Sequence, residues 1–270
     1  MKAYKFKIRR PGKAIVAKFE QHLLLCCELY NSGLRERIDA YKINNISLNY
    51  QDQQNQLPEI KEVREDLNLV YSQVLQDALK RLDKTFKAFF SRVKKGERRV
   101  GFPRYKGKNR YDSFTFPQAN GCFRLEGNNL YLSKIGKVKI HLSQTMMGKV
   151  KTCTIKREVS GWFAIFTVET EEQFLPKTGQ AVGIDAGIEN FITLSNGEQI
   201  PNFKYFEQSQ KELRRKQRSV SRKKKGSQSR KKAVIQLKKT HVKIKNQRND
   251  FAHKLSTRIV KEFDFIAIED

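Results

Sequence analysis

The 270-residue sequence lacks any long apolar stretch. Its longest strongly apolar run, residues 23–27, falls far short of the ~20 residues that a helix needs to cross a bilayer. The first ten residues, MKAYKFKIRR, also lack the apolar region of a secretory signal. We therefore expect neither a membrane-spanning nor a secreted protein, and we predict a cytoplasmic protein without a membrane partner.

Cysteine is also scarce. Cys26, Cys27, Cys122 and Cys153 form no C-x-x-C pair and have no histidine at the spacing of a zinc site. We therefore predict no zinc site within these residues. Because free cysteine is usually buried, we expect small buried side chains in a reducing compartment rather than disulfides.

Acidic residues are few compared with basic ones. The chain has 28 Asp and Glu against 55 Lys and Arg, a formal net charge of +27. Apolar residues still make up 38% of the sequence, so the chain can bury a core, and at ~150 residues per domain its length predicts about two compact units. A surface this positive repels itself unless a polyanion covers it, and nucleic acid is the leading candidate.

The first part of the chain predicts a strand followed by helices. Residues 2–8 alternate charged and apolar side chains, as a half-buried strand does, and Pro11-Gly12 ends the pattern. Apolar residues then recur at helical spacing over residues 16–41 and 60–93, and the polar residues 44–56 separate the two stripes. We expect two amphipathic helices that pack as an antiparallel pair or a small bundle.

The next segment, GFPRYKGKNRYDSFTFPQ at residues 101–118, interleaves cations with aromatic rings. Cations bind phosphates and flat rings stack on bases, so this pattern is typical of a nucleic-acid surface. The alternative is a solvated basic loop followed by a strand whose rings lie in the core, and the sequence does not decide between them. The candidate nucleic-acid-binding residues here are Arg104, Tyr105, Lys106, Arg110, Tyr111 and Phe114.

Residues 122–169 have the alternation and tight turns of a small antiparallel barrel or sandwich. A new unit begins after Gly179, with the apolar strand AVGID, a second strand FITLS and the hairpin signal Asn196-Gly197. Residues 204–248 then hold 18 Lys or Arg and only two acids, and Gly226 is expected to separate two helices.

This basic helical stretch is a second candidate nucleic-acid surface. The plain alternative is a solvated helix face. Cations this dense repel one another in isolation, however, and a nucleic-acid backbone relieves that repulsion. The candidate residues are Arg222, Lys223, Lys224, Lys225, Arg230, Lys231 and Lys232.

Two acids end apolar strands in this last unit. Asp185 closes AVGID and Glu269 closes FIAIE, while Asp270 is expected on the opposite face as a bystander. If the two strands are neighbours their carboxylates converge, and hard oxygen ligands beside phosphate favour Mg²⁺ or Mn²⁺. Such a site would serve phosphodiester cleavage. Taken alone, an acidic residue at the end of an apolar strand is more often a solvent-exposed residue where the strand ends than a catalytic group.

Several linked motifs resemble the transposon-encoded TnpB (OrfB) family, which is related to the type V CRISPR effector nucleases. They are VGIDAGIENFITLSNGE, SRKKKGSQSRKKA, NQRNDFAHKLSTRIV and FIAIED, together with GFPRYKGKNRYDSFTFPQ and the amino-terminal helix. The resemblance implies an RNA-guided, Mg²⁺-dependent (or Mn²⁺-dependent) DNA endonuclease of a prokaryote, acting at the nucleoid with a guide RNA and double-stranded target DNA. It makes Asp185 and Glu269 the first two catalytic, metal-binding acids of a RuvC site.

The same resemblance implies an α+β, multidomain fold. An antiparallel β-barrel of the wedge type, residues 1–11 and 97–178, receives an inserted helical recognition domain, residues 12–96. A partial RNase H-like (RuvC) α/β domain follows at residues 179–270. Family members carry a third acid, and usually a four-cysteine zinc ribbon, beyond the second acid. Neither is in this sequence, so we expect an incomplete RuvC site.

Two functions therefore stay open. One is RNA-guided DNA cleavage; the other is a guide-RNA- and DNA-binding remnant, or a repressor-like derivative, without catalysis. A DNA-strand transferase acting alone is disfavoured, because no Tyr or Ser lies beside paired histidines. The sequence specifies neither the guide RNA nor the oligomeric state.

Overall fold

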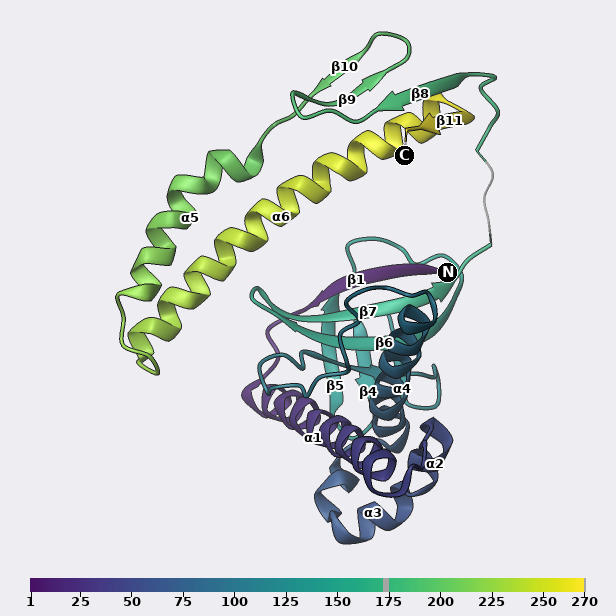
Figure 1. Cartoon of the computed structure of the whole chain (residues 1–270), viewed down its shortest axis with the longest axis vertical. Helices are drawn as coiled ribbons and strands as arrows, with labels where there is room; N and C mark the ends of the chain where they lie inside the picture. The colour runs from purple at the N-terminus through teal and green to yellow at the C-terminus, as the bar shows by residue number, and fades with distance from the viewer. Residues whose placement is uncertain (172–174, 270) are drawn as a thin grey trace. The chain divides into compact units, whose positions relative to one another are not determined.

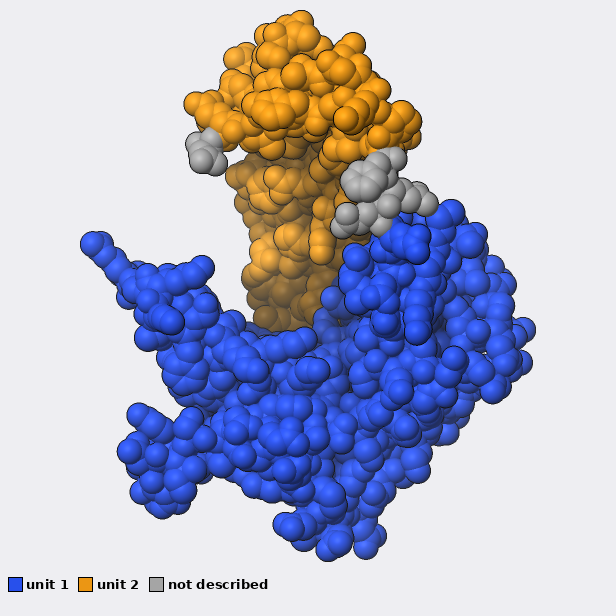
Figure 2. Space-filling model, turned by 90° about the vertical axis from the view of Figure 1, so that its right-hand side faces the viewer, with its two compact units in different colours: residues 1–171 blue, residues 172–270 orange. Residues whose placement is uncertain are grey.

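The structure is a computed structural model that describes residues 1–171 and 175–269. The chain divides into two compact units, unit 1 at residues 1–171 and unit 2 at residues 172–270 (Figure 2). The further division of unit 1 into wedge and recognition domains stays a prediction. The role assigned to Asp270, and part of the predicted 97–178 segment, lie outside the described residues.

Unit 1 is built on one sheet of seven strands in the order β2-β6-β7-β1-β5-β4-β3, and each pair of neighbours is antiparallel (Figure 1). The predicted amino-terminal strand is confirmed as β1, in the middle of the sheet between β7 and β5. The strands are β1 (Lys2–Ile8), β2 (Ser113–Phe116), β3 (Phe123–Glu126), β4 (Asn129–Leu132), β5 (Gly136–His141), β6 (Lys149–Glu158) and β7 (Gly161–Glu169).

The predicted antiparallel β-structure is confirmed, but the predicted barrel is not closed, because over residues 1–171 the edge strands β2 and β3 do not pair with each other. Both edge strands have only four residues. One edge is also occupied by a helix, since Arg81 donates a hydrogen bond of 2.7 Å to the carbonyl oxygen of Ser113 in β2. A closing strand would need backbone acceptors of this kind, so the contact favours an open edge.

The helices of unit 1 follow the apolar stripes with one interruption. They are α1 (Lys13–Asn44), α2 (Tyr50–Asn55), α3 (Leu57–Val63), the 3₁₀ turn η1 (Glu65–Leu69) and α4 (Ser72–Lys94). The second predicted helix is thus broken, because Arg64 and Val70 leave the helical conformation. The polar segment also holds a helix: the Asn49 side chain caps α2 while Asp52 bonds back to Asn49, which satisfies the free backbone donors locally.

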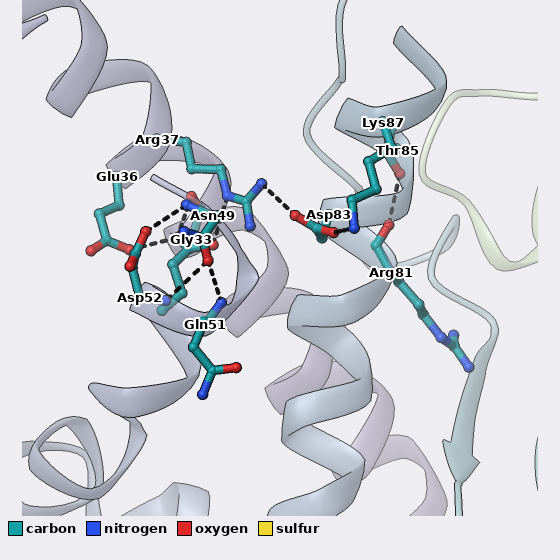
Figure 3. Close-up of polar contacts among 11 residues, drawn as sticks. Gly33, Glu36, Arg37, Asn49, Gln51, Asp52, Arg81, Asp83, Thr85 and Lys87 are labelled. Atoms are coloured by element: carbon teal, nitrogen blue, oxygen red, sulfur yellow. Dashed lines mark hydrogen bonds and ion pairs between the residues drawn. The ribbon is translucent and has the colours of Figure 1, made fainter. Parts of the chain in front are cut away.

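A buried polar network anchors this polar helix to its neighbours (Figure 3). Gln53 of α2 accepts a hydrogen bond of 2.8 Å from Arg37 of α1 and donates one of 2.9 Å to the Gly33 carbonyl oxygen. Arg37 in turn pairs with Asp83 of α4 at 3.2 Å, and both side chains are buried. The pair is positioned by three helices at once, so it fixes how these helices pack.

Unit 2 is a small mixed sheet with two long helices. Strands β8 (Ala181–Asp185), β9 (Asn190–Leu194) and β10 (Gln199–Pro201) form an antiparallel meander, and β11 (Phe265–Ile268) pairs with β8 in parallel. Helices α5 (Tyr205–Ser221) and α6 (Gln228–Glu262) pack on each other. The predicted hairpin turn and the break at Gly226 are confirmed, and Gly226 has a φ of +87° that favours glycine.

Two further expectations concern single features. All four cysteines are free and buried, as the sequence predicts. Among the described residues, no helix carries an apolar stretch long enough to cross a bilayer.

Candidate functional site

The two predicted acids follow neighbouring parallel strands. β8 and β11 pair from Ala181 with Phe265 to Ile184 with Ile268. Asp185 is the last residue of β8 and Glu269 directly follows β11, so continuing this register by one residue puts Asp185 opposite Glu269. Side chains of paired residues in parallel strands point to the same face of the sheet. The two carboxylates therefore share one face at the same end of the strand pair.

This face is open, whereas the opposite face is covered. Val182, Ile184 and Ile266 point to the core of unit 2, which Leu255 and Ile259 of α6 complete. Asp185 and Glu269 alternate with these residues and are exposed. Along their own strands, the next residues on the same face are small, Gly183 and Ala267, which pair with each other. Across the sheet, Asp185 pairs with Thr193 of β9. A ligand of the carboxylates thus has room along β8 and β11.

An acid at the start of β11 fixes the register that brings the carboxylates together. The carboxylate of Asp264 accepts hydrogen bonds from the backbone N–H groups of Thr178 at 2.9 Å and Gly179 at 2.7 Å. The Asp264 N–H donates to the carbonyl oxygen of Gln180 at 2.9 Å. The bonds from the Thr178 and Gly179 backbone lower the pKa of Asp264. The two strands are therefore clamped where they start, and Asp185 and Glu269 lie where they end.

Two carboxylates are a partial but suitable donor set for a hard divalent cation. Mg²⁺ is commonly held by one or two protein carboxylates, with waters and substrate phosphates completing the octahedron. Within residues 1–171 and 175–269, no group of three or more His, Cys, Asp or Glu lies close enough together to hold a metal ion. Asp185 and Glu269 thus fit a cation that takes its other ligands from substrate and water.

The basic surface of unit 2 centres on one face of α5. Cations recur there at helical spacing and line a shallow groove of about 570 Å³. Sequence reasoning selected Arg222 and Lys223 from this face but missed its start, although the spacing of three and four residues carries the signal. The residues that line the groove are Lys211, Arg214, Arg215, Arg218, Ser219, Arg222 and Lys223.

None of these six cations forms an ion pair within the described part of the chain, whereas the neighbouring Lys216 pairs with Glu212 at 2.5 Å. The other predicted cations surround the bend between α5 and α6. Lys224 and Lys225 are exposed in the bend, Lys231 and Lys232 are exposed on the first turns of α6, and Arg230 is half-buried.

The predicted site in residues 101–118 divides into an exposed part and a buried part. Arg104, Tyr105, Lys106 and Arg110 are exposed. The choice of Tyr111 and Phe114 as base-stacking residues is wrong, because both rings lie in the core of unit 1.

The burial of these two rings has a simple cause. Phe114 and Phe116 share the buried face of β2, and Phe114 packs on Phe19 of α1 with ring centroids 6.1 Å apart. Tyr111 packs against Tyr30, and burial raises its pKa. For Tyr111 and Phe114, the structure therefore agrees with the alternative that the sequence left open, namely aromatic rings that lie in a core.

The exposed part of this loop is held by its backbone. The side-chain amide of Asn31 in α1 donates to the Lys106 carbonyl oxygen at 2.9 Å and accepts from the Lys106 N–H at 2.8 Å. Cys27 adds a hydrogen bond of 3.2 Å to the same carbonyl. The main chain is therefore fixed, and the side chains of Arg104, Tyr105 and Lys106 are exposed on it, with the Lys106 ammonium 5.9 Å from the Tyr30 ring centroid.

Comparison with known proteins agrees with these features. A family model named OrfB_IS605, described as "Probable transposase", matches residues 165–270. A protein of Escherichia coli (strain K12), "Putative RNA-guided DNA endonuclease InsQ", is 30% identical over 273 aligned residues, which cover 100% of this chain and 66% of that protein. The chain belongs to the TnpB (OrfB) family.

A second member of the TnpB family, "Putative RNA-guided DNA endonuclease" of Streptomyces pristinaespiralis, is 35% identical over 248 residues, covering 90% of this chain and 60% of its own length. The chain thus spans 60% to 66% of the length of these two relatives. A solved structure, "Cryo-EM structure of CRISPR-Cas12f Ternary Complex", aligns with 94% of this chain and 63% of its own at 12% identity and a TM-score of 0.42.

The match to the OrfB_IS605 model covers all of the described part of unit 2, including both acids, α5 and the clamp at Asp264. The basic loop of unit 1 lies outside that match but inside the alignment with the E. coli relative.

Proposed function

We propose that this TnpB-family chain takes part in RNA-guided DNA cleavage, and that Asp185 and Glu269 are two acids of a metal-dependent, RuvC-type phosphodiesterase site. The observation that carries the proposal is the parallel pairing of β8 with β11 up to Ile184 and Ile268, which supports a position of both carboxylates at the same end of the strand pair. The sheet order, an antiparallel meander with a parallel fourth strand beside its first, supports an RNase H-like arrangement.

In this proposal the two acids hold the metal and the basic surfaces hold nucleic acid. Bound Mg²⁺ or Mn²⁺ would lower the pKa of a water nucleophile and stabilise charge on the leaving oxygen. Asp185 and Glu269 supply oxygen ligands, and their small neighbours Gly183 and Ala267 leave space for a phosphate. Sequence recognition would come from pairing between a guide RNA and double-stranded target DNA, and the protein would act at the nucleoid in the cytoplasm.

The domain roles predicted from the sequence form part of the same proposal. Residues 1–11 and 97–178 would act as the wedge, residues 12–96 as the recognition domain, and residues 179–270 as the RuvC part. The exposed cations of α5 and of the loop before β2 would contact backbone phosphates, which carry no sequence information by themselves.

A second candidate function is binding of guide RNA and DNA without cleavage. Within residues 1–171 and 175–269, no third acid lies with Asp185 and Glu269 in a group that could hold a metal ion. In this second function, the charged surfaces of the chain would bind nucleic acid and the two acids would have no catalytic role.

The test compares cleavage and binding in the same samples. The chain is expressed together with the DNA of its own locus and purified with the RNA that stays bound to it. Target DNA is then added with Mg²⁺ or with EDTA. We expect Asp185→Asn and Glu269→Gln to abolish cleavage while DNA binding is retained. Asp250→Asn, which removes an exposed acid on α6 that pairs only with Lys254, is the control and is expected to cleave normally.

Metal binding is measured separately from activity. Titration of the chain with Mn²⁺ is expected to show a site that either substitution weakens and the Asp250→Asn control leaves unchanged. Cleavage that persists in both acid variants contradicts the proposed site. Binding without cleavage by the unaltered chain selects the second candidate.

A further inference from the structure

Four phenylalanines form an aromatic cluster at the end of α4. Phe86, Phe89 and Phe90 come from the helix, and Phe102 comes from the loop that follows it. Phe102 lies edge-on to Phe86 at 5.8 Å and to Phe89 at 5.3 Å between ring centroids. Two of the four residues are about half exposed, Phe90 at 58% and Phe102 at 48%. We call these four residues the phenylalanine cluster.

The cluster is supported from beneath, so its outer rings have a fixed base. Phe86 packs against the core of unit 1. The guanidinium of Arg37 lies 5.1 Å from the Phe86 ring centroid and is held by its buried pair with Asp83. The loop that carries Phe102 is tied to α1 a few residues later, through the two hydrogen bonds between Asn31 and Lys106. Rings held this way lose little freedom when a ligand binds.

Exposed cations surround the phenylalanine cluster along the chain. Residues 92–106 contain seven Lys and Arg and one acid, Glu97, and all seven cations are exposed. Over the described residues, none of the seven forms an ion pair. The surface therefore combines flat apolar rings with unneutralised positive charge.

We infer that the phenylalanine cluster is a stacking platform for unpaired nucleic-acid bases, with Phe90 and Phe102 as the contacting rings. The inference rests on the proposed function and makes it more specific, because it assigns single-stranded nucleic acid to this surface. Successive bases of a single strand can stack on aromatic rings while its phosphates contact Lys and Arg. A duplex buries the faces of its bases, so it can use the cations but not the rings.

Charge argues for this ligand over an apolar protein partner. A protein segment that covers the two rings would also need several acidic residues to neutralise the seven cations. A nucleic-acid strand carries one phosphate with each base and so supplies that negative charge itself. Of the rings selected from the sequence, Tyr111 and Phe114 are buried and Tyr105 is exposed, and Phe102, at the start of the same basic segment, is exposed as well.

The test measures binding of the full chain to a labelled 15-nucleotide oligo(dT) and to a mixed-sequence duplex of the same length, in EDTA and without guide RNA. Phe90→Leu and Phe102→Leu keep an apolar side chain but remove the flat ring. We expect the double variant to bind the single strand ~10-fold more weakly and the duplex as the unaltered chain does, with the same salt dependence. The control is Phe163→Leu, a half-exposed ring on β7 that lies under Lys5.

A second measurement does not depend on the variants. Oligo(dU) that contains 5-iodouracil is cross-linked to the unaltered chain by light, and the linked residues are identified by mass spectrometry. We expect cross-links at Phe90 or Phe102. Unchanged affinity for the single strand in the double variant, an equal loss for the duplex, or cross-links confined to other residues would each overturn the inference. Because the assay contains no metal, a failure of the cleavage proposal leaves its outcome unaffected.

Discussion

Replacement of Phe114 by alanine separates a core ring from a base-stacking ring. Phe114 is 1% exposed and packs against Phe19, His22 and Phe116, with ring centroids 5.2 to 6.1 Å apart. A buried aromatic covers ~150–250 Å² of surface, and its truncation also leaves a cavity. We expect Phe114→Ala to lower the free energy of unfolding of unit 1 by ~3–5 kcal/mol, a large share of the ~5–15 kcal/mol of a typical domain.

The assay uses the only tryptophan of the chain, Trp162, which lies in the same core. Its ring centroid is 4.8 Å from that of Phe19, so its fluorescence in urea follows the unfolding of unit 1 and not of unit 2. The matched control is Phe90→Ala, which removes a ring that is 58% exposed and is expected to cost less than ~1 kcal/mol.

The opposite pattern would refute this reasoning. If Phe114 stacks on a base, its removal weakens nucleic-acid binding by ~1–3 kcal/mol and leaves the urea midpoint near that of the unaltered chain. A loss of stability below ~1 kcal/mol together with such a loss of affinity would show that the ring is not part of the core.

Three further predictions concern acid stability, the buried ion pair and the basic groove. Burial lowers the pKa of His22 from 6.5 to about 4. The unfolded chain therefore takes up a proton on His22 at a higher pH than the folded chain does. The free energy of unfolding of unit 1 is expected to fall by up to ~3 kcal/mol as the pH drops from 6.5 to 4. His22→Gln is expected to remove that pH dependence in urea titrations followed by tryptophan fluorescence, and a slope that survives would contradict it. Asp83→Ala leaves the buried Arg37 without its acidic partner and is expected to lower the free energy of unfolding by ~3–5 kcal/mol, measured by the same fluorescence signal. The double replacement Arg37→Met and Asp83→Leu is expected to lower it less, because no buried charge is left unpaired. Substitution of both Arg214 and Arg218 by alanine is expected to make the slope of log binding constant against log salt for duplex DNA less steep by ~2, measured by fluorescence anisotropy between 50 and 200 mM salt. The control Lys254→Ala removes a cation that is paired with Asp250 and is expected to change this slope less.

Local patterns were sufficient for much of the fold. The alternation in residues 2–8, the stripe that begins at Val16 and the Asn196-Gly197 turn predict β1, α1 and the β9–β10 hairpin, because side-chain periodicity and turn chemistry act over a few residues. The break of the second stripe at Arg64 and Val70 did not show in the sequence, because the apolar spacing continues across both residues. Sequence spacing also selected the acids at the two strand ends.

The tertiary structure decided which faces are covered and which strands are neighbours. Alternation gives Phe114 and Phe116 one common face, but only the helices packed against β2 determine that this face is buried while Phe90 and Phe102 stay exposed. In the same way, only the parallel pairing of β8 with β11 brings together the two strand ends at which Asp185 and Glu269 lie. That pairing joins segments separated by two long helices, and a sequence pattern acts over too short a range to specify it.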